Sequence, residues 1–217
     1  TAINLNGSKN QIGTYSFPKL VYIYPGFLQT LDDRNMRNGF VEIVKHSLLS
    51  DEANWNRIRN STWPLEEKEL LSFLIQSINF KKSIVEQDIY ENGWRKILNF
   101  GHSIGHAIES YYLSKGIELL HGEAIAYGII CEAKISKEIF GWEADDLNNI
   151  VQFLSDFCVK DKFDEMSVDQ IIDWMSSDKK IMHGKQNFSL LQKIGSPVIN
   201  VPVEQKLIHQ VLTESFV

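Results

Sequence analysis

Apolar residues recur at helical spacing along most of the chain. From about residue 31 to 49, Met36, Phe40, Ile43 and Val44 share one face of a predicted helix. Thr30 and Asp33 have the spacing of a capping box, so we expect them to begin it. The same periodicity predicts helices over about 65–88, 95–114, 122–140, 145–157, 167–176 and 203–215, and a short strand over 189–193.

The first thirty residues have a different pattern. Glycine and proline interrupt them repeatedly, and residues 20–24 form an apolar run that predicts a buried strand. The pattern as a whole predicts a mainly α fold, in which a strand-and-loop segment over 1–30 precedes an all-helical domain over 31–217.

Composition and charge argue against a nucleic-acid-binding or membrane-spanning protein. The chain has 217 residues, of which 43% are hydrophobic and 23% charged, as in an ordinary globular protein. A net charge of −6 argues against a nucleic-acid surface, and no apolar run reaches the ~18 residues of a membrane span. Cys131 and Cys158 have no paired spacing, which suits a reducing compartment, so we expect a cytoplasmic protein.

Two histidines at helical spacing are the first candidates for chemistry. His102, Gly105, His106 and Glu109 fall on one helix face, and the glycine leaves room for a ligand or another backbone. The motif differs from the zinc-protease sequence H-E-x-x-H, because Ser103 occupies the place of the general base. By themselves, the histidines are also compatible with an ordinary amphipathic surface.

Two further segments add potential metal ligands. His121 lies at a predicted helix start, and Glu42 lies three residues before Lys45 on a helix. Glu42 and Lys45 could simply form a salt bridge on a solvated surface. Glu42, His102 and His121 together, however, form a carboxylate and imidazole set of the kind that binds catalytic zinc with one position open. Spacing alone does not show that the three converge.

Longer motifs carry a family resemblance. Residues 99–109 read N-F-G-H-S-I-G-H-A-I-E and residues 120–124 read L-H-G-E-A, which closely resembles the signature of the 3-dehydroquinate synthase family. Ser103 and Ile104 replace the commoner Thr and Phe, which are mild changes. Further matches extend along the chain at 1–4, 9–13, 17–18, 27–31, 39–45, 93–95 and 178–180.

The resemblance implies a domain organisation. Members of this family have an N-terminal α/β nucleotide-binding domain followed by a helical domain. Residues 1–30 would be a remnant of the first, and residues 31–217 would form the metal- and substrate-binding domain. We therefore expect the chain to be a C-terminal part that is inactive alone.

The resemblance also implies an activity, that of a metal- and NAD-dependent carbon–oxygen lyase. The family converts 3-deoxy-D-arabino-heptulosonate 7-phosphate, a phosphorylated sugar acid, to 3-dehydroquinate and phosphate in the shikimate pathway. By resemblance, Glu42, His102 and His121 would bind Zn²⁺ or Co²⁺, and the protein would be a homodimer. The positions expected to contact NAD⁺ are Lys9, Phe27, Leu28, Gln29 and Thr30.

Fixed cations and polar groups would hold the carboxylate and phosphate of that substrate. The register of the family selects Lys81 rather than Lys82, and it places Glu91 in a supporting role. Arg95 suits a two-pronged contact with a carboxylate. The positions implied for the anion pocket are Lys45, Lys81, Arg95, Asn99, His106 and either Lys179 or Lys180.

Two other interpretations stay open. The first is another sugar phosphate cyclase, such as one making 2-deoxy-scyllo-inosose or an epi-valiolone, and the second is a non-catalytic helical module with a metal site. Arg95 would discriminate within the cyclases, because it would pair with a carboxylate that only dehydroquinate-type substrates carry. A His/Asp phosphohydrolase is disfavoured, since no His-Asp dipeptide occurs.

Overall fold

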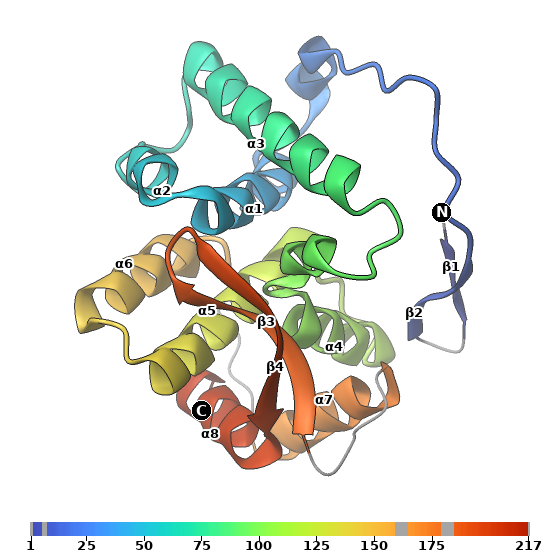
Figure 1. Ribbon diagram of the computed structural model, residues 1–217, viewed down its shortest axis with the longest axis vertical. Coiled ribbons are helices and arrows are strands. Elements are labelled where there is room, and N and C mark those ends of the chain that lie inside the picture. The colour runs from blue at the N-terminus through green and yellow to red at the C-terminus, as the bar shows by residue number, and fades with distance from the viewer. Residues whose placement is uncertain (1, 6–7, 159–164, 179–184, 217) are drawn as a thin grey trace.

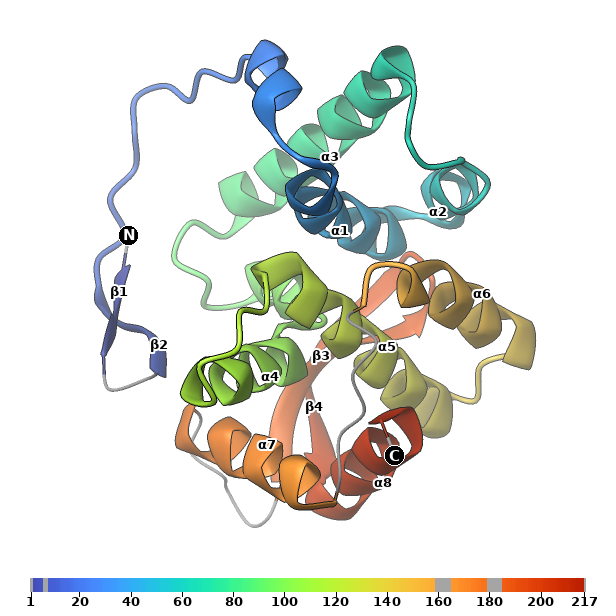
Figure 2. The same ribbon diagram turned by 180° about the vertical axis from the view of Figure 1, so that it is seen from behind.

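The computed structural model describes residues 2–5, 8–158, 165–178 and 185–216 (Figure 1). Helices dominate it, which confirms the mainly α prediction. The first three helices gather at one end of the molecule, and the others surround a two-stranded hairpin (Figure 2). The α-helices are α1 Asp33–Ser50, α2 Glu52–Arg59, α3 Glu67–Gln87, α4 His102–Ser114, α5 His121–Phe140, α6 Ala144–Ser155, α7 Glu165–Asp178 and α8 Gln205–Phe216.

The strands form two antiparallel hairpins, β1 Ala2–Leu5 with β2 Ser8–Gly13, and β3 Lys185–Lys193 with β4 Ser196–Glu204. The second hairpin lies inside the region expected to be all-helical. Pro202 therefore belongs to a strand, and the last helix begins after it. Two 3₁₀ helices, η1 Pro25–Thr30 and η2 Trp94–Asn99, complete the elements of the described residues.

Helix α5 lies between two hydrophobic clusters. Ile125 and Ile129 pack into the cluster formed with α1, α2, α3 and α6. Tyr127 and Ile135 pack into the other cluster, with α4, α7, α8 and the hairpin. A helix that is apolar on all sides is buried on all sides, so α5 is the central support for both halves of the described chain.

Two helices differ from the predictions, one in the residue that caps it and one because it is interrupted. Asp32 rather than Thr30 caps α1, because its side chain accepts the backbone N–H of Asn35. The single helix predicted over 95–114 is interrupted at Gly101, whose φ of 80° lies in the left-handed region. Its two parts are η2 and α4.

The buried strand predicted over residues 20–24 is wrong. These residues form no strand, and Leu20 and Tyr22 are 77% and 83% exposed. Among the described residues no strand pairs with residues 20–24, and a buried strand needs such a partner for its backbone N–H and C=O groups. Among the described residues, no helix has the length and apolar character needed to cross a membrane.

Candidate active site

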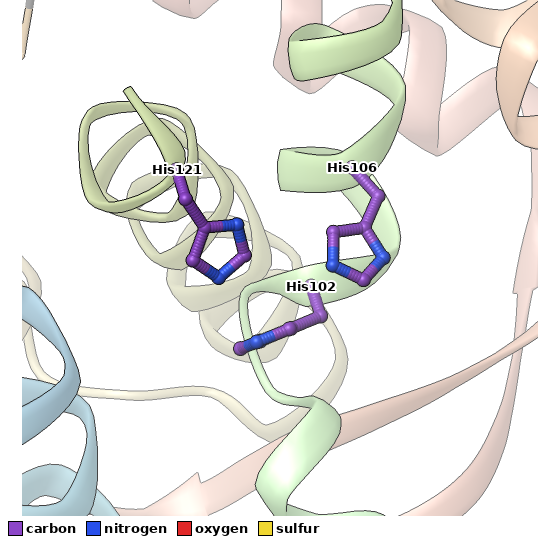
Figure 3. A group of neighbouring side chains, drawn as sticks. All are labelled: His102, His106 and His121. Atoms are coloured by element: carbon purple, nitrogen blue, oxygen red, sulfur yellow. The ribbon is translucent and has the colours of Figure 1, made fainter. Parts of the chain in front are cut away.

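Three histidines converge where α4 meets the first turn of α5 (Figure 3). His102 begins α4, His106 follows one turn later, and His121 begins α5. Each ring offers a nitrogen within 4.8 Å of the nitrogens offered by the other two. The helical spacing that placed His102 and His106 on one face also directs both toward His121.

Close contact between α4 and α5 makes this convergence possible. A Cβ added at Gly105 would lie 3.0 Å from the backbone oxygen of Ala124. The sequence left two roles open for Gly105, space for a ligand or space for another backbone. The structure shows the second role, because the backbone of α5 lies against Gly105.

Helix α1 brings a carboxylate close to one of these rings, that of His102. Glu42 Oε1 lies 3.6 Å from His102 Nε2, and Glu42 Oε2 accepts a hydrogen bond of 2.8 Å from Lys45 Nζ. Oε1 itself is buried and accepts no hydrogen bond from the described residues. A buried oxygen without a donor is costly, and a cation between Glu42 and His102 would satisfy it. The residues present therefore fit a divalent metal.

Hydrogen bonds orient two of the imidazoles for metal binding. His102 Nδ1 lies 3.2 Å from the carbonyl oxygen of Phe100, and His121 Nδ1 lies 3.1 Å from Glu109 Oε2. Both oxygens act as acceptors, so each Nδ1 donates, which leaves Nε2 as the ring nitrogen available to a metal. Metal-binding histidines commonly use this arrangement.

The electrostatics favour the protonation states that a metal requires. Burial raises the pKa of Glu42, but the nearby Lys45 ammonium and His102 more than offset this and lower it to about 2. Burial, together with the charge of Lys45, holds the pKa of His102 well below its usual value. At neutral pH the site therefore presents a carboxylate and a neutral imidazole.

The predicted cations differ in their placement. Lys45 is buried, and its ammonium donates to Glu42 and to the carbonyl oxygen of Leu98. Burial lowers its pKa, and the charge of Glu42 opposes that change. Lys81 is exposed on α3, yet near enough for its charge to act on Lys45. Lys179 and Lys180 lie outside the described residues.

Arg95 lies in the segment between α3 and α4. Its Nη1 donates to the carbonyl oxygen of Ile89 at 2.7 Å, and its guanidinium lies over the ring of Tyr15. The backbone N–H of Arg95 donates to Asp88 Oδ2 at 3.0 Å. These contacts hold the residue at the end of α3.

Glu91 and Asn99 contact each other in the same segment. Asn99 Nδ2 donates to Glu91 Oε1 at 2.7 Å, and Glu91 has a positive φ of 59°. A non-glycine residue in this region is uncommon, and here the side chain holds Asn99. The supporting role expected of Glu91 stays a prediction.

The expected NAD⁺ positions lie in the first part of the chain. Phe27, Leu28, Gln29 and Thr30 belong to η1, which directly precedes α1, and the Phe27 side chain is 76% exposed. Lys9 belongs to β2. Their contact with NAD⁺ stays a prediction.

Sequence reasoning missed two buried polar residues near the cluster. His46 lies one turn after Glu42, with Nδ1 2.7 Å from Ser77 Oγ. Glu132 lies on α5 and bonds to the start of α4. Glu132 stands between Cys131 and Ala133 in a largely apolar stretch, and that signal was available in the sequence, whereas His46 lies between Lys45 and Ser47 and gave no such signal.

Comparisons with solved structures give the class of protein. Over 98% of its length the chain is similar to 61% of a 2-deoxy-scyllo-inosose synthase complexed with carbaglucose-6-phosphate, NAD⁺ and Co²⁺, with a TM-score of 0.83 and 29% identity. It is also similar to 2-epi-5-epi-valiolone synthase from Streptomyces hygroscopicus, with NAD⁺ and Zn²⁺ bound. That likeness has a TM-score of 0.82 at 25% identity and covers 99% of this chain and 60% of the other. The fold is that of sugar phosphate cyclases.

Sequence comparisons give the family. Residues 39–181 match the model described as 3-dehydroquinate synthase C-terminal, and residues 1–38 match the N-terminal model. The chain belongs to the 3-dehydroquinate synthase family, which confirms the resemblance. It is 37% identical to 3-dehydroquinate synthases of Parabacteroides distasonis and Pyrococcus furiosus, over 98% and 99% of its own length. It spans 60% and 61% of those relatives.

Proposed function

We propose that the chain is the metal- and substrate-binding part of a 3-dehydroquinate synthase, which converts 3-deoxy-D-arabino-heptulosonate 7-phosphate to 3-dehydroquinate and phosphate. The observation that carries the proposal is the unpaired, buried Glu42 Oε1, which lies 3.6 Å from His102 Nε2 beside two more imidazoles. The match of residues 1–38 and residues 39–181 to the two models of this family supports it.

Glu42, His102 and His121 would hold Zn²⁺ or Co²⁺. Such an ion, when bound, polarises an alcohol and chelates adjacent hydroxyls. The Co²⁺ and Zn²⁺ in the two similar cyclases support a divalent metal, and their NAD⁺ supports that cofactor for the whole protein. Residues proposed to reach NAD⁺ are Lys9, Phe27, Leu28, Gln29 and Thr30.

The chain's own cations would bind the two anionic groups of the substrate. Arg95 would contact the carboxylate through its guanidinium, and Lys81 would reach the pocket from α3. Lys45 keeps Glu42 ionised, while Glu91 holds Asn99 toward the pocket. His106 is proposed to bind phosphate, together with Lys179 or Lys180. A homodimer and a cytoplasmic location belong to the same proposal.

A second candidate is another sugar phosphate cyclase, which the 29% and 25% identical structures favour. The two candidates differ in whether the substrate carries a carboxylate. Calorimetric titration of the Zn²⁺-loaded chain with heptulosonate 7-phosphate and with glucose 6-phosphate separates them. A 3-dehydroquinate synthase site binds the first at least ~10-fold more tightly, because only it offers Arg95 a bidentate partner.

Single-residue variants test whether Arg95 and Lys81 cause the difference in ligand affinity. Arg95→Lys is expected to remove most of the preference, since an ammonium lacks the two-pronged geometry. Lys81→Ala weakens both ligands, and Lys82→Ala, the neighbouring control, changes neither. Equal affinity for both ligands in the wild type contradicts the 3-dehydroquinate synthase assignment. Metal binding without affinity for either ligand favours a non-catalytic module.

A further inference from the structure

Glu132 is a buried acid that the proposed function does not use. It lies on α5, about three turns after His121, and its exposed fraction is 0%. Burying a carboxylate is expensive unless hydrogen bonds and charges compensate it. The groups that hydrogen-bond to the Glu132 carboxylate therefore indicate its role.

Those partners are at the start of α4. Glu132 Oε2 accepts the backbone N–H of Gly101 at 2.7 Å, and Oε1 accepts that of Ile104 at 3.2 Å. The first N–H groups of a helix have no partner within the helix. The N-cap position of α4 is Gly101, which has no side chain to accept them. A carboxylate from another helix supplies the cap and also complements the positive end of the helix dipole.

A second contact fixes the same turn. Gly128 lies one turn before Glu132 on α5, and a Cβ added there would collide with the carbonyl oxygen of Gly101. The backbone of α5 therefore touches Gly101 directly, while Glu132 bonds to its N–H. Two contacts, one turn apart on α5, fix both the position and the rotation of the first turn of α4.

This turn carries a proposed metal ligand. His102 follows Gly101 directly, and His106 follows one turn later on the same helix. His121 is on α5, the helix that holds Glu132. The relative placement of His102 and His121 thus depends on the contacts that hold the start of α4 against α5.

We propose that Glu132 is a positioning residue for the metal site, acting through the backbone of Gly101 and Ile104 to hold His102 opposite His121. The inference rests on the proposed metal site. The alternative is that Glu132 stabilises the fold without influencing metal geometry, and the experiment must separate these two roles.

Glu132→Gln is the informative variant, because it keeps the size of the side chain. Its amide has one acceptor oxygen for two backbone donors, so its NH₂ group faces an N–H. Titration with Co²⁺, followed by visible absorption, reports affinity and coordination geometry together. We expect about tenfold weaker binding, in the range typical of residues that orient metal ligands, and a changed absorption spectrum.

Ser136→Ala is the matched control. Ser136 is buried one turn further along α5. Its hydroxyl donates to the backbone carbonyl oxygen of Glu132 and accepts the backbone N–H of Leu191, and neither bond involves the Glu132 carboxylate or α4. This variant should lower the melting temperature without changing the Co²⁺ affinity or spectrum. Wild-type affinity and spectrum in Glu132→Gln, with a melting temperature lowered as in Ser136→Ala, would overturn the inference. Absence of Co²⁺ binding in the wild type would instead overturn the proposed metal site, and with it this inference.

A measurement on the metal-free wild type covers the case in which Glu132→Gln does not fold. The cap predicts that the amide hydrogens of Gly101 and Ile104 exchange slowly with solvent, as N–H groups within a helix do. Rapid exchange of both in the folded protein would show that Glu132 does not hold them, and would refute the inference.

Discussion

The segment over residues 14–31 and helix α5 are both rich in apolar residues, yet their surroundings are opposite. Leu20 and Tyr22 project into solvent, whereas Ile125 and Ile129 are completely buried. Helices α1, α4, α6 and α8 and strand β3 contact α5, whereas the first segment runs along the outside of the molecule (Figure 2). Apolar character therefore indicates that burial is favourable, but neighbouring elements decide whether it happens.

The outer segment contacts the rest of the described chain at a functionally interesting place. Tyr15 and Phe17 pack against Tyr90 at ring distances of 5.9 and 6.2 Å. Tyr15 also lies beneath the guanidinium of Arg95. The outer segment thus contacts Arg95, one of the residues proposed to bind the substrate.

The largest effect is expected from identical leucine truncations in the buried core and in the outer segment. Leu48 is fully buried in α1, so Leu48→Ala should lower the free energy of unfolding by about 3 kcal/mol. Leu20→Ala, at an exposed position, should change it by less than ~0.5 kcal/mol. Urea denaturation measures both. Similar losses would mean that the outer segment is buried in solution.

A matched pair of glycines tests how closely α5 is packed. Gly128→Ala introduces a Cβ against the carbonyl oxygen of Gly101 and should cost about 2 kcal/mol. Gly39→Ala, on an open face of α1 with no atom within 4 Å of the new Cβ, should stabilise by about 0.5 kcal/mol. Thermal unfolding compares them. A neutral Gly128→Ala would contradict the close approach of α4 and α5.

The pH dependence of the metal-free protein reports the buried histidine beside Glu42. Burial, aided by the charge of Lys45, lowers the pKa of His46 to about 3, against ~6.5 when unfolded. Between these values the unfolded state binds the extra proton, so stability falls as pH falls, by about 1.4 kcal/mol per pH unit. His46→Gln should flatten the curve between pH 6.5 and 4.5. An unchanged slope would argue against a buried, neutral His46.

The smallest effect concerns the contact between the outer segment and Arg95. Tyr15→Ala removes the ring beneath Arg95 and should cost about 0.5 kcal/mol, as exposed cation–π pairs do. Tyr22→Ala, whose ring is mostly exposed, is the control and should cost less. Both are measured by urea denaturation. Equal effects would mean that the outer segment does not contact the Arg95 region.

Much of the fold followed from the sequence because helical periodicity is a local property. The long helices α1, α3 and α5 appeared within a few residues of their predicted bounds. The eight-residue α2 was missed, since two turns give too little periodicity. The β3–β4 hairpin was half predicted: the short strand over 189–193 lies in β3, whereas β4 was missed and the helix predicted over 203–215 included its last two residues.

The candidate site, like the fold, could be predicted only in part from the sequence. His102 and His106 could be placed together because four residues separate them on one helix. The approach of Glu42, some 60 residues earlier, depends on how α1 packs against α4 and α5, so spacing could not reveal it. The cap by Glu132 likewise joins two helices, and only the fold brings its carboxylate to Gly101.

Metal stoichiometry tests the central claim most directly. Zn²⁺ bound per chain after dialysis should be near one for the wild type and for His106→Ala, and near zero for Glu42→Ala, His102→Ala and His121→Ala. The double variant His102→Ala/His106→Ala excludes substitution of one imidazole for another. Retention of about one Zn²⁺ by all three single variants of the proposed ligands would contradict the site.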